Sequence, residues 1–577
     1  MLHHTKISFK KFALELNRIN NLYMKILIIG GVAGGATAAT RLRRLNEENE
    51  IIIFEKGEHV SFANCGLPYH IGGVITKRSK LLLQTPTSLK TRFNLDVRIF
   101  NEVLKINKEE KTVEVRNLIT KEIYTESYDK LLLSPGAEPF RPNIPGIESD
   151  KIMTLRNVAD MDRIISKTKD LKNIAVVGGG FIGLEVAENL VENGLNVSVI
   201  ELGNQVMAPV DYEFAKMVEH HAEIRNLNIL INTGVEAFQE KGDEIELKLN
   251  TGETIVADAV VFAIGVKPEN ALAKAAELDL GITGGIAVNE FMQTSDPNIY
   301  AVGDAVEVSH FINQVKVLIP LAWPANRQGR IVADNMVRGN KISYKGTLGT
   351  SIIKFFDLTV GATGLNEKLL KRYNIPYQTT TVTRANHASY YPGATNIVLK
   401  INFGKDGTIY GAQALGHEGV DKRIDIIATA IKGNLTVYDL QEIEIAYAPP
   451  YNSAKDPVNI LGYVAENMLN GDLEAVNYDE LDALLSNKDT ILVDVRTEKE
   501  FEKGSIPNAI NLDLDTIRQN LDFFDKNKTY VIYCQVGLRG YLAHAILRNN
   551  NIKSVNLNGG YSIWKSANNE KANPVLV

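Results

Sequence analysis

Two segments of the chain share one order of hydrophobic and polar positions. In each, a short apolar run leads to a glycine-rich turn, a helix-length segment and a second apolar run that ends on glutamate. The first segment predicts strands at residues 26–29 and 51–55 with a helix between them, and the second predicts strands at 174–177 and 197–201 in the same arrangement. This order is typical of the parallel sheet of a dinucleotide-binding domain.

The two turns themselves support that prediction. Glycines let the backbone approach a pyrophosphate, the following helix offers free N–H groups, and a carboxylate after the second strand accepts ribose hydroxyls. The second turn has every residue of this fingerprint, namely Gly178, Gly180, Gly183 and the terminal Glu201. The first turn has valine at the middle glycine position but keeps the terminal Glu55. Its candidate dinucleotide contacts are Gly30, Gly31, Val32, Ala33, Gly34 and Gly35.

Other apolar runs indicate that the first nucleotide domain is interrupted by insertion of the second. One run at 131–137 lies between the two turns, and another at 299–304 follows both. Near residue 341 the pattern changes to β-rich segments such as 350–356. A polar junction at 470–475 then precedes a new alternation of helix and strand, which predicts a small separate α/β domain.

The composition fits a globular protein with several hydrophobic cores. The chain has 577 residues, of which 45% are hydrophobic and 23% charged, and this length exceeds what one core organises. The net charge of −6 gives no basic field for a nucleic acid backbone or an anionic membrane surface. Since no apolar run reaches roughly 18 residues, we expect no membrane-spanning helix.

The chain has only two cysteines, Cys65 and Cys534. A secreted chain of this size normally carries more, so the count favours a reducing cytoplasm. Residues 1–23 are basic but lack the apolar core of a signal peptide. We therefore expect them to form a loose N-terminal extension.

The first cysteine follows the first nucleotide segment directly, in the run Ser61-Phe62-Ala63-Asn64-Cys65-Gly66-Leu67-Pro68-Tyr69. A thiol at the start of a helix gains from the helix dipole, which favours the reactive thiolate. A buried, inert cysteine is the commoner alternative. The scarcity of cysteine and its place beside a nucleotide segment favour the reactive one.

Residues 24 to about 468 resemble the single-cysteine branch of the flavin- and pyridine-nucleotide-dependent disulfide reductases. Within it, the Ser61–Tyr69 run, 447–451 (Tyr-Ala-Pro-Pro-Tyr) and 454–459 (Ala-Lys-Asp-Pro-Val-Asn) are similar to the coenzyme A disulfide reductases and the NAD(P)H-dependent coenzyme A persulfide reductases. The resemblance implies FAD in the first segment and NAD(P)H in the second. The further flavin contacts that it implies are Lys56, Gly136, Asp304 and Ala322.

No second cysteine lies four or five residues from Cys65, so an internal disulfide of the glutathione reductase type cannot form there. In the coenzyme A reductases this thiol instead forms a mixed disulfide with coenzyme A. The resemblance carries over six contacts to that ligand, Thr37, Arg41, Arg44, Ser61, Asn64 and Lys455. Cations there would neutralise the phosphates of coenzyme A. For Arg41 and Arg44 alone, an ordinary solvated helix face is the alternative.

The resemblance also implies two tyrosines that the opposing subunit contributes, and hence a homodimer. Tyr447 is one, and Tyr390 or its neighbour Tyr391 is the other. A phenol is neutral at pH 7 and can donate its proton to a departing thiolate. Interface packing is an equally good interpretation of Tyr391.

The second cysteine lies in the run Tyr533-Cys534-Gln535-Val536-Gly537-Leu538-Arg539, after a strand and before a helix. Such a loop can direct backbone N–H groups at one sulfur, and Arg539 stabilises negative charge there. With 493–496 (Val-Asp-Val-Arg) and 559–561 (Gly-Gly-Tyr), this domain resembles a single-domain rhodanese, which implies that Cys534 carries persulfide sulfur. The alternative is a rhodanese-like domain without activity, but such domains typically lose the cysteine.

These inferences give one architecture. The predicted fold class is α/β, with two Rossmann-like dinucleotide-binding domains, an α+β dimerisation domain and a C-terminal rhodanese domain. The predicted boundaries are 1–23 for the N-terminal extension, 24–136 and 263–340 for the FAD domain, 137–262 for the NAD(P)H domain, 341–470 for dimerisation and 475–577 for the rhodanese.

The predicted function is NAD(P)H-dependent reduction of coenzyme A disulfide or persulfide, with sulfane sulfur from Cys534 and release of hydrosulfide. Coenzyme A disulfide reduction for thiol redox balance is one alternative. An NADH oxidase or peroxidase is another, but these relatives place histidine where this chain has Ala33. A sulfur carrier or redox sensor without catalysis is a third. Glu201 favours NADH over NADPH, because it would repel a 2′-phosphate, and use of both nucleotides is the alternative. No metal site is expected.

Overall fold

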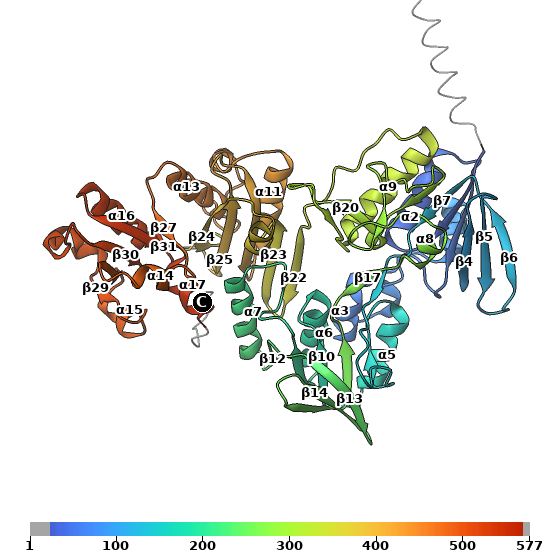
Figure 1. Ribbon diagram of the computed structural model, residues 1–577, viewed down its shortest axis with the longest axis horizontal. Helices are drawn as coiled ribbons and strands as arrows, with labels where there is room; N and C mark the ends of the chain where they lie inside the picture. The colour runs from blue at the N-terminus through green and yellow to red at the C-terminus, as the bar shows by residue number, and fades with distance from the viewer. Residues whose placement is uncertain (1–22, 569–577) are drawn as a thin grey trace, which may run out of the picture. The chain divides into compact units, whose positions relative to one another are not determined.

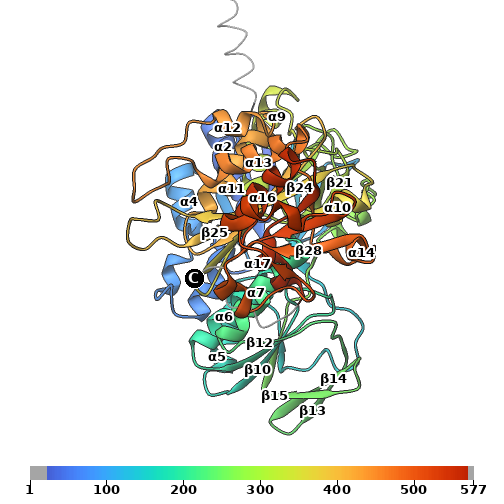
Figure 2. The same cartoon turned by 90° about the vertical axis from the view of Figure 1, so that its left-hand side faces the viewer.

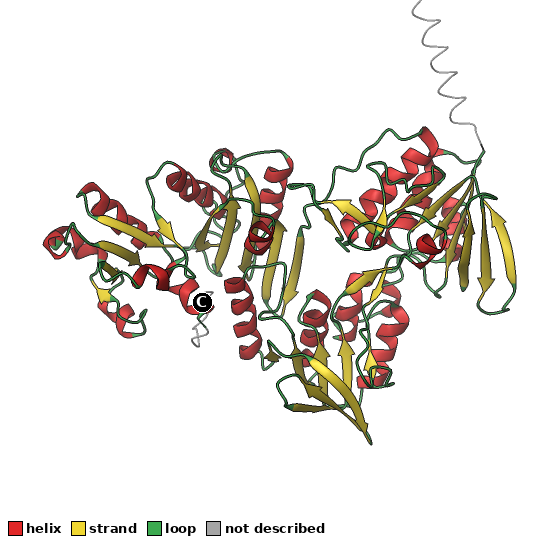
Figure 3. Ribbon diagram, viewed as in Figure 1, coloured by secondary structure: helices red, strands yellow, loops and turns green. Residues whose placement is uncertain are grey.

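The computed structural model describes residues 23–568. The predicted N-terminal extension therefore lies, apart from Tyr23, outside the described residues. The chain divides into two compact units. The first unit contains the described residues up to 178 together with 189–197 and 235–349, and the second contains 179–188, 198–234 and 350–568. Figure 3 shows helices and strands alternating along both units, which confirms the predicted α/β class.

A five-stranded parallel sheet forms the centre of the first unit, with the order β19-β7-β1-β2-β3. Its strands are β1 (Lys25–Ile29), β2 (Glu50–Glu55), β3 (Asp96–Ile99), β7 (Lys130–Leu133) and β19 (Ile299–Ala301). The middle strands are nearly uninterrupted apolar runs because both faces of a parallel sheet are covered. The helices α2 (Ala33–Leu45) and α9 (Ala322–Arg338) pack against each other beside it.

Smaller sheets complete the first unit (Figure 1). A parallel group joins β10 (Asn173–Val177), β16 (Ala259–Phe262) and β9 (Ile152–Met153). Two antiparallel sheets are β4 (Asn101–Asn107), β5 (Thr112–Asn117) and β6 (Ile123–Ser127), and β13 (Val235–Lys241), β14 (Glu244–Leu249) and β15 (Thr254–Ala257). Short strands are β8 (Ala137–Pro139), β17 (Val266–Pro268), β18 (Ile286–Ala287), β20 (Val306–Ser309) and β21 (Lys316–Val317), and the other helices are α3 (Leu67–Ile71), α4 (Pro86–Phe93), α5 (Val158–Thr168) and α8 (Ala271–Ala275).

An antiparallel sheet in the second unit has the order β22-β23-β26-β25-β24, so β24 is an edge strand. Its strands are β22 (Ser351–Phe355), β23 (Leu358–Gly364), β24 (Gln378–Ala385), β25 (Asn396–Phe403) and β26 (Ile409–Gly416). Helix α13 (Pro457–Leu469) packs against β24, and α11 (Val420–Lys432) packs against β26. The same unit contains β12 (Asn228–Leu230), α7 (Tyr212–Ile224), α10 (Glu367–Arg372) and α12 (Asp439–Glu442), whereas β11 (Asn196–Ile200) and α6 (Phe181–Glu192) have residues in both units.

The C-terminal part of the second unit, drawn in orange to red in Figure 2, contains a parallel sheet with the order β27-β31-β30-β28-β29. Its strands are β27 (Ala475–Val476), β28 (Thr490–Asp494), β29 (Ile510–Asn511), β30 (Thr529–Tyr533) and β31 (Lys553–Leu557), with helices α14 (Leu481–Leu485), α15 (Glu498–Glu502), α16 (Leu538–Asn549) and α17 (Gly560–Ala567). Helix α14 begins at Leu481 after a turn in which the Asn477 N–H donates to the Glu480 carboxylate. Among the residues that the structure describes, no helix is long and apolar enough to span a membrane.

Candidate functional site

The first glycine turn brings the chain unusually close to its neighbours. Gly30 has φ +95°, and a Cβ there would lie 2.1 Å from the Ser134 carbonyl oxygen. Only glycine fits this conformation and this approach. The turn leads from the end of β1 directly into the N-terminus of α2, the kind of helix end that favours an anionic pyrophosphate.

Glu55, the last residue of β2, holds that turn through both carboxylate oxygens. Oε2 accepts a hydrogen bond from the Gly31 N–H at 3.0 Å, and Oε1 accepts one from the Gly57 N–H at 2.8 Å. The carboxylate is therefore fixed beside the turn, as a ribose site requires. The neighbouring Lys56 is exposed.

Asp304 lies in a single 3₁₀ turn after β19, where burial raises the pKa of its carboxyl and Arg156 opposes that effect. The preceding Gly303 donates its N–H to the Gln328 side chain at 2.8 Å. Ala322 opens α9, and Gly136 adopts φ +77° close to Arg156. The first-segment residues predicted at a flavin thus occur in turns and helix starts of one unit, and they fit a dinucleotide.

Glu201 repeats the arrangement of Glu55 in the second unit. Its Oε2 accepts from the Gly179 N–H and its Oε1 from the Gly203 N–H, both at 2.7 Å. Gly179 itself was absent from the sequence prediction, because the fingerprint marks the residues on either side of it. Gly178, which belongs to the first unit, adopts φ +111°. In the second unit, Gly180 has open space around its Cβ position and Gly183 is buried in α6.

Cys65 is exposed in a 3₁₀ turn, Asn64–Gly66, directly before the five-residue helix α3. Ser61, four residues earlier, has φ +47° and donates its N–H to the Gly31 carbonyl at 2.8 Å. The cysteine segment is thus anchored to the first glycine turn. Asn64 is exposed beside the thiol.

Thr37, Arg41 and Arg44 lie on one face of α2, because their spacing follows the helical repeat. Thr37 donates to the Asn326 side chain at 2.6 Å, and Arg41 makes two bonds to Asp334 at 2.8 and 3.0 Å that raise the pKa of the guanidinium. Arg44 is exposed. Arg41 therefore already has an anionic partner in α9. Lys455, in the other unit, is exposed with its Nζ 5.9 Å from the Tyr463 ring.

Of the candidate tyrosines, the structure brings Tyr390 and Tyr447 together. Their hydroxyl oxygens lie 3.0 Å apart, both side chains are exposed, and the hydrogen bond raises the pKa of Tyr390. Tyr391 instead packs its ring edge-on against His387 at 5.7 Å between centroids. The geometry favours Tyr390 over Tyr391 as the second phenol.

A buried arginine that the sequence gave no reason to select connects the two tyrosine loops. Arg423 of α11 is 1% exposed, and it donates to the Asn386 carbonyl at 2.8 Å and to the Asn452 side chain at 3.1 Å. It also pairs with Asp456, which caps α13, at 2.9 Å. The Asp456-Pro457 pair, a helix-start signal, was the only trace of this group in the sequence.

Cys534 follows β30 and is 1% exposed. Its Sγ accepts a hydrogen bond from the Gly537 N–H at 3.2 Å, the one amide that contacts the sulfur in the described hydrogen bonds of this loop. Four residues, 534–537, separate the end of β30 from α16, which begins at Leu538. The Tyr561 N–H donates to the Cys534 carbonyl at 2.8 Å, and a Cβ at Gly560 would lie 2.4 Å from that carbonyl.

Charged side chains surround this loop. Arg539 forms two bonds with Glu500 at 2.6 and 2.7 Å, and they lower the pKa of Glu500 to about 2. The electrostatic influence of Cys534 adds to that of Glu500 in raising the pKa of Arg539, so the guanidinium lies near the thiol. Arg496, paired with the buried Asp494, donates to Gln535 at 2.9 Å. Glu500 therefore shares the cation that the sequence assigned to the sulfur.

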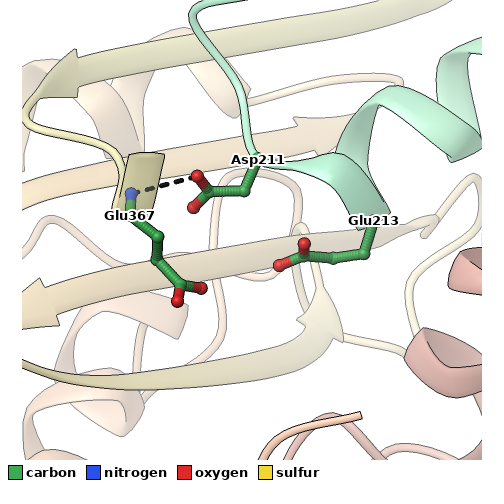
Figure 4. Close-up of side chains that lie close together, drawn as sticks. All are labelled: Asp211, Glu213 and Glu367. Carbon is green, nitrogen blue, oxygen red and sulfur yellow. Dashed lines mark hydrogen bonds between the residues drawn. The ribbon is translucent and has the colours of Figure 1, made fainter. Parts of the chain in front are cut away.

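By geometry alone, three carboxylates lie close enough together to hold a metal ion (Figure 4). They belong to Asp211, Glu213 and Glu367. The Nζ of the fully buried Lys400 lies among them, 3.0 Å from Asp211 and in direct contact with Glu213 and Glu367. Burial disfavours the charge on Lys400, yet Glu213 and its neighbours outweigh burial and raise the pKa of the ammonium. The Lys400 ammonium thus occupies the place that a metal ion would take among the three carboxylates.

Three family models match the chain. The pyridine nucleotide-disulphide oxidoreductase model covers residues 24–329, the dimerisation domain of the same group covers 350–457, and the rhodanese-like domain covers 477–567. The first model alone matches more than half of the chain.

Relatives and solved structures agree with these models. A coenzyme A disulfide reductase of Staphylococcus aureus (strain JH9) is 40% identical over 446 residues, which are 77% of this chain and the whole of the relative. The reduced CoADR-RHD of Bacillus anthracis is 51% identical with a TM-score of 0.93 and covers 95% of this chain and 98% of its own. An NAD-dependent persulfide reductase from A. fulgidus is 34% identical with a TM-score of 0.88, covering 94% of this chain and 100% of its own.

Proposed function

The chain belongs to the pyridine nucleotide-disulphide oxidoreductase family, and on that premise we propose that it reduces coenzyme A disulfide and coenzyme A persulfide with NAD(P)H. Its rhodanese domain supplies the sulfane sulfur. The observation that carries this proposal is that the two cysteines of the chain lie in two different motifs, one similar to the disulfide reductases and one similar to the rhodaneses. The S. aureus coenzyme A disulfide reductases align with 77% of this chain. The CoADR-RHD and persulfide reductase structures align with 95% and 94% of it.

The residues that would hold FAD are the turn from Gly30 to Gly35, Glu55 and Asp304. Lys56, Gly136 and Ala322 are the further FAD contacts that the resemblance implies. NAD(P)H would lie at the turn that contains Gly178, Gly180 and Gly183, with Glu201 at its ribose. When bound, FAD supplies the two-electron chemistry that connects the nicotinamide to sulfur. Every other step falls to the protein's own groups.

Cys65 attacks the inner sulfur of coenzyme A persulfide as a thiolate. The bond between the two persulfide sulfurs breaks, hydrosulfide leaves, and a mixed disulfide joins coenzyme A to Cys65. Two electrons from NAD(P)H then cleave that disulfide and restore the thiolate. The departing coenzyme A sulfur takes one proton, which Tyr390 or Tyr447 of a second subunit donates. With coenzyme A disulfide as substrate, the leaving group is a second coenzyme A thiolate instead.

The Cys534 thiolate takes the outer sulfur of thiosulfate, with sulfite as the leaving group, or one sulfur of a polysulfide, which leaves one sulfur shorter. The coenzyme A thiolate then attacks the outer sulfur of the Cys534 persulfide, which gives coenzyme A persulfide and restores the Cys534 thiolate. The Gly537 N–H and the guanidinium of Arg539 stabilise the negative charge on that sulfur. Thr37, Arg41, Arg44, Ser61, Asn64 and Lys455 are the proposed coenzyme A contacts. Of the two proposed contacts Arg41 and Arg44, only Arg41 has a bidentate carboxylate partner in the described hydrogen bonds, so Arg44 is the stronger candidate for a phosphate.

We also propose a homodimer in a cytoplasmic setting. The match to a dimerisation domain supports the first, and the low cysteine count supports the second. The boundaries predicted from the sequence for the FAD, NAD(P)H, dimerisation and rhodanese domains stay predictions.

An anaerobic assay with NADH and coenzyme A persulfide tests this function. We expect one hydrosulfide for each NADH consumed, no turnover in the Cys65→Ser variant, and full turnover in Cys534→Ser when the persulfide is supplied ready-made. With thiosulfate and coenzyme A as the only sulfur source, Cys534→Ser should lose hydrosulfide release. Hydrosulfide release that survives Cys65→Ser would contradict the mechanism.

A second candidate is reduction of coenzyme A disulfide for thiol balance, which the S. aureus relatives favour by name. Comparing kcat/KM for the disulfide and the persulfide separates the two. The same assay with oxygen or peroxide tests an oxidase or peroxidase. A flavin that NADH reduces without turnover of any of these substrates would indicate a sensor or carrier.

A further inference from the structure

One face of the rhodanese domain meets the edge strand of the antiparallel sheet in the same unit. The exposed edge of β24 would leave backbone N–H and C=O groups without partners, and such groups are costly to bury. Thr379, Thr380 and Thr381 of this strand are nevertheless all buried. Figure 1 shows β24 on the side of this sheet that faces β27 and β31.

The side chain of Asn558 pairs with that edge. Its Oδ1 accepts a hydrogen bond from the Thr381 N–H at 2.9 Å, and its Nδ2 donates to the Thr379 carbonyl at 3.2 Å. A neighbouring strand would use the same two backbone groups of β24, so the carboxamide takes the place of one peptide unit. The Thr380 hydroxyl adds a longer bond of 3.3 Å to the same oxygen.

Asn558 is equally well fixed in its own domain. Its N–H donates to the Val476 carbonyl at 2.8 Å, and its Nδ2 also donates to the Asn477 side chain at 2.9 Å. The next residue, Tyr478, directs its hydroxyl to Glu213 of α7 at 3.4 Å, and α17 packs beside α7. The contact with β24 therefore belongs to a wider docking face.

The segment that follows Asn558 holds the loop of the second cysteine. Gly559 and Gly560 have φ +72° and +66°, a pair of positive values that only consecutive glycines adopt readily. The N–H groups of Tyr561 and Ser562 then donate to the carbonyls of Cys534 and Gln535 at 2.8 and 3.0 Å. Two residues thus separate the amide on β24 from the first N–H that holds the cysteine loop.

We propose that Asn558 is a positioning residue that couples docking of the rhodanese domain on β24 to the closed, buried conformation of the Cys534 loop. Docking fixes the position of the Asn558 side chain. The Gly559-Gly560 pair then fixes the positions of Tyr561 and Ser562, whose N–H groups hold the Cys534 loop closed. Cys534 is consequently protected while the domain is docked, and its exposure rises when the contact with β24 is lost. The significance for sulfur transfer rests on the proposed function, but the coupling itself does not.

The test measures alkylation of Cys534 by iodoacetamide in the flavin-loaded, full-length protein. Trypsin cleaves after Lys528 and Arg539, so one peptide that contains Cys534 reports the rate by mass spectrometry, separately from Cys65. We expect Asn558→Ala to raise the alkylation rate about tenfold, because the variant loses the two side-chain hydrogen bonds to the β24 backbone and the docked, closed state is then less populated. Thr380→Val, which removes only the long hydroxyl bond, should leave the rate nearly unchanged.

A second variant acts from the other side of the contact. Thr381→Pro removes the N–H that Asn558 accepts and leaves every rhodanese residue in place, and proline is tolerated on the open side of an edge strand. Hydrogen exchange of β24 shows whether the contact has opened. Flavin content and circular dichroism show that each variant is folded.

Two results would overturn the proposal. If β24 exchanges faster in both variants while the Cys534 rate stays at the wild-type value, docking does not control the loop. If neither exchange nor alkylation changes, Asn558 does not hold the domain on β24. Both outcomes can be measured even if the protein produces no hydrosulfide, because alkylation and hydrogen exchange require no turnover. Failure of the proposed function is therefore distinguishable from failure of this coupling.

Discussion

The hydroxyl oxygens of Tyr390 and Tyr447 lie 3.0 Å apart although 57 residues separate them in the chain. Both phenols are exposed and lie on two loops. The buried Arg423 connects these loops by donating hydrogen bonds to the Asn386 carbonyl and the Asn452 side chain. The hydrogen bond raises the pKa of Tyr390, so the phenol keeps its proton across the neutral range. A pair of this kind can donate one proton and stabilise the phenolate that remains.

Removing either hydroxyl should therefore slow the release of coenzyme A. We expect Tyr390→Phe and Tyr447→Phe each to lower kcat for coenzyme A disulfide by roughly 10²-fold, a loss within the usual range for general acid catalysis. KM for NADH should not change. Steady-state kinetics measures both. Tyr391→Phe is the matched control, because Tyr391 packs against His387; an equal loss there would reassign the role.

Arg423 should contribute strongly to stability. It is 1% exposed, and its partner Asp456 is fully buried on the side chain. Replacement by methionine leaves that carboxylate without its cation, which costs about 3–5 kcal/mol for a buried pair. Urea unfolding of the flavin-loaded protein measures the loss. The neighbouring Lys422→Met should cost less than about 1 kcal/mol, and a similar cost for both variants would refute this assignment.

The pair of Arg539 and Glu500 predicts opposite effects of two substitutions on Cys534. Glu500→Gln removes the carboxylate that shares the guanidinium, so the thiolate is favoured and alkylation of Cys534 at pH 7 should be faster. Arg539→Gln removes the cation, so alkylation should be slower. Samples quenched at successive times and analysed by peptide mass spectrometry give the alkylation rates of both variants. Changes in the same direction would show that loop opening, not charge, governs the reactivity.

Glu201 should set the choice of nicotinamide. Its carboxylate is held by the Gly179 and Gly203 N–H groups at the proposed ribose site. Glu201→Gln removes the negative charge that repels a 2′-phosphate, so the preference for NADH over NADPH should fall by about tenfold. The ratio of kcat/KM for the two nucleotides measures this. The exposed Glu236→Gln serves as control, and an unchanged ratio in Glu201→Gln would remove Glu201 from the ribose site.

His310 should make the protein less stable in mild acid. Burial lowers its pKa to about 4, so the folded protein keeps the ring neutral, and the Ile312 N–H donates to its Nδ1. The unfolded chain binds the proton at about pH 6.5, so stability is complete above that pH and falls as the pH drops toward 4, by up to about 3 kcal/mol.

The His310→Gln variant keeps an acceptor but cannot gain that charge. Its free energy of unfolding in urea should therefore fall less steeply between pH 6.5 and 4.5 than that of the wild type. Parallel curves for the two proteins would mean that His310 does not carry this part of the acid sensitivity.

The local pattern was enough to predict the elements around both nucleotide turns and the rhodanese sheet. The strand predicted at 51–55 is β2 within one residue, and the strand predicted at 174–177 is β10 within one residue. Fingerprint glycines, terminal glutamates and two cysteines in distinct motifs also selected the candidate chemistry. These signals are contained in a few neighbouring residues, because turn conformation and strand periodicity are local properties of the chain.

The sequence could not choose between Tyr390 and Tyr391, nor could it show that Asp334 already engages Arg41, that Glu500 shares Arg539, or that Lys400 occupies the group of three carboxylates. It also gave no sign that Asn558 pairs with β24. Each of these depends on side chains brought together from distant parts of the chain, where packing decides which neighbour a charge or an amide meets. Sequence spacing fixes what a residue can do, but only the folded chain fixes which partner it has.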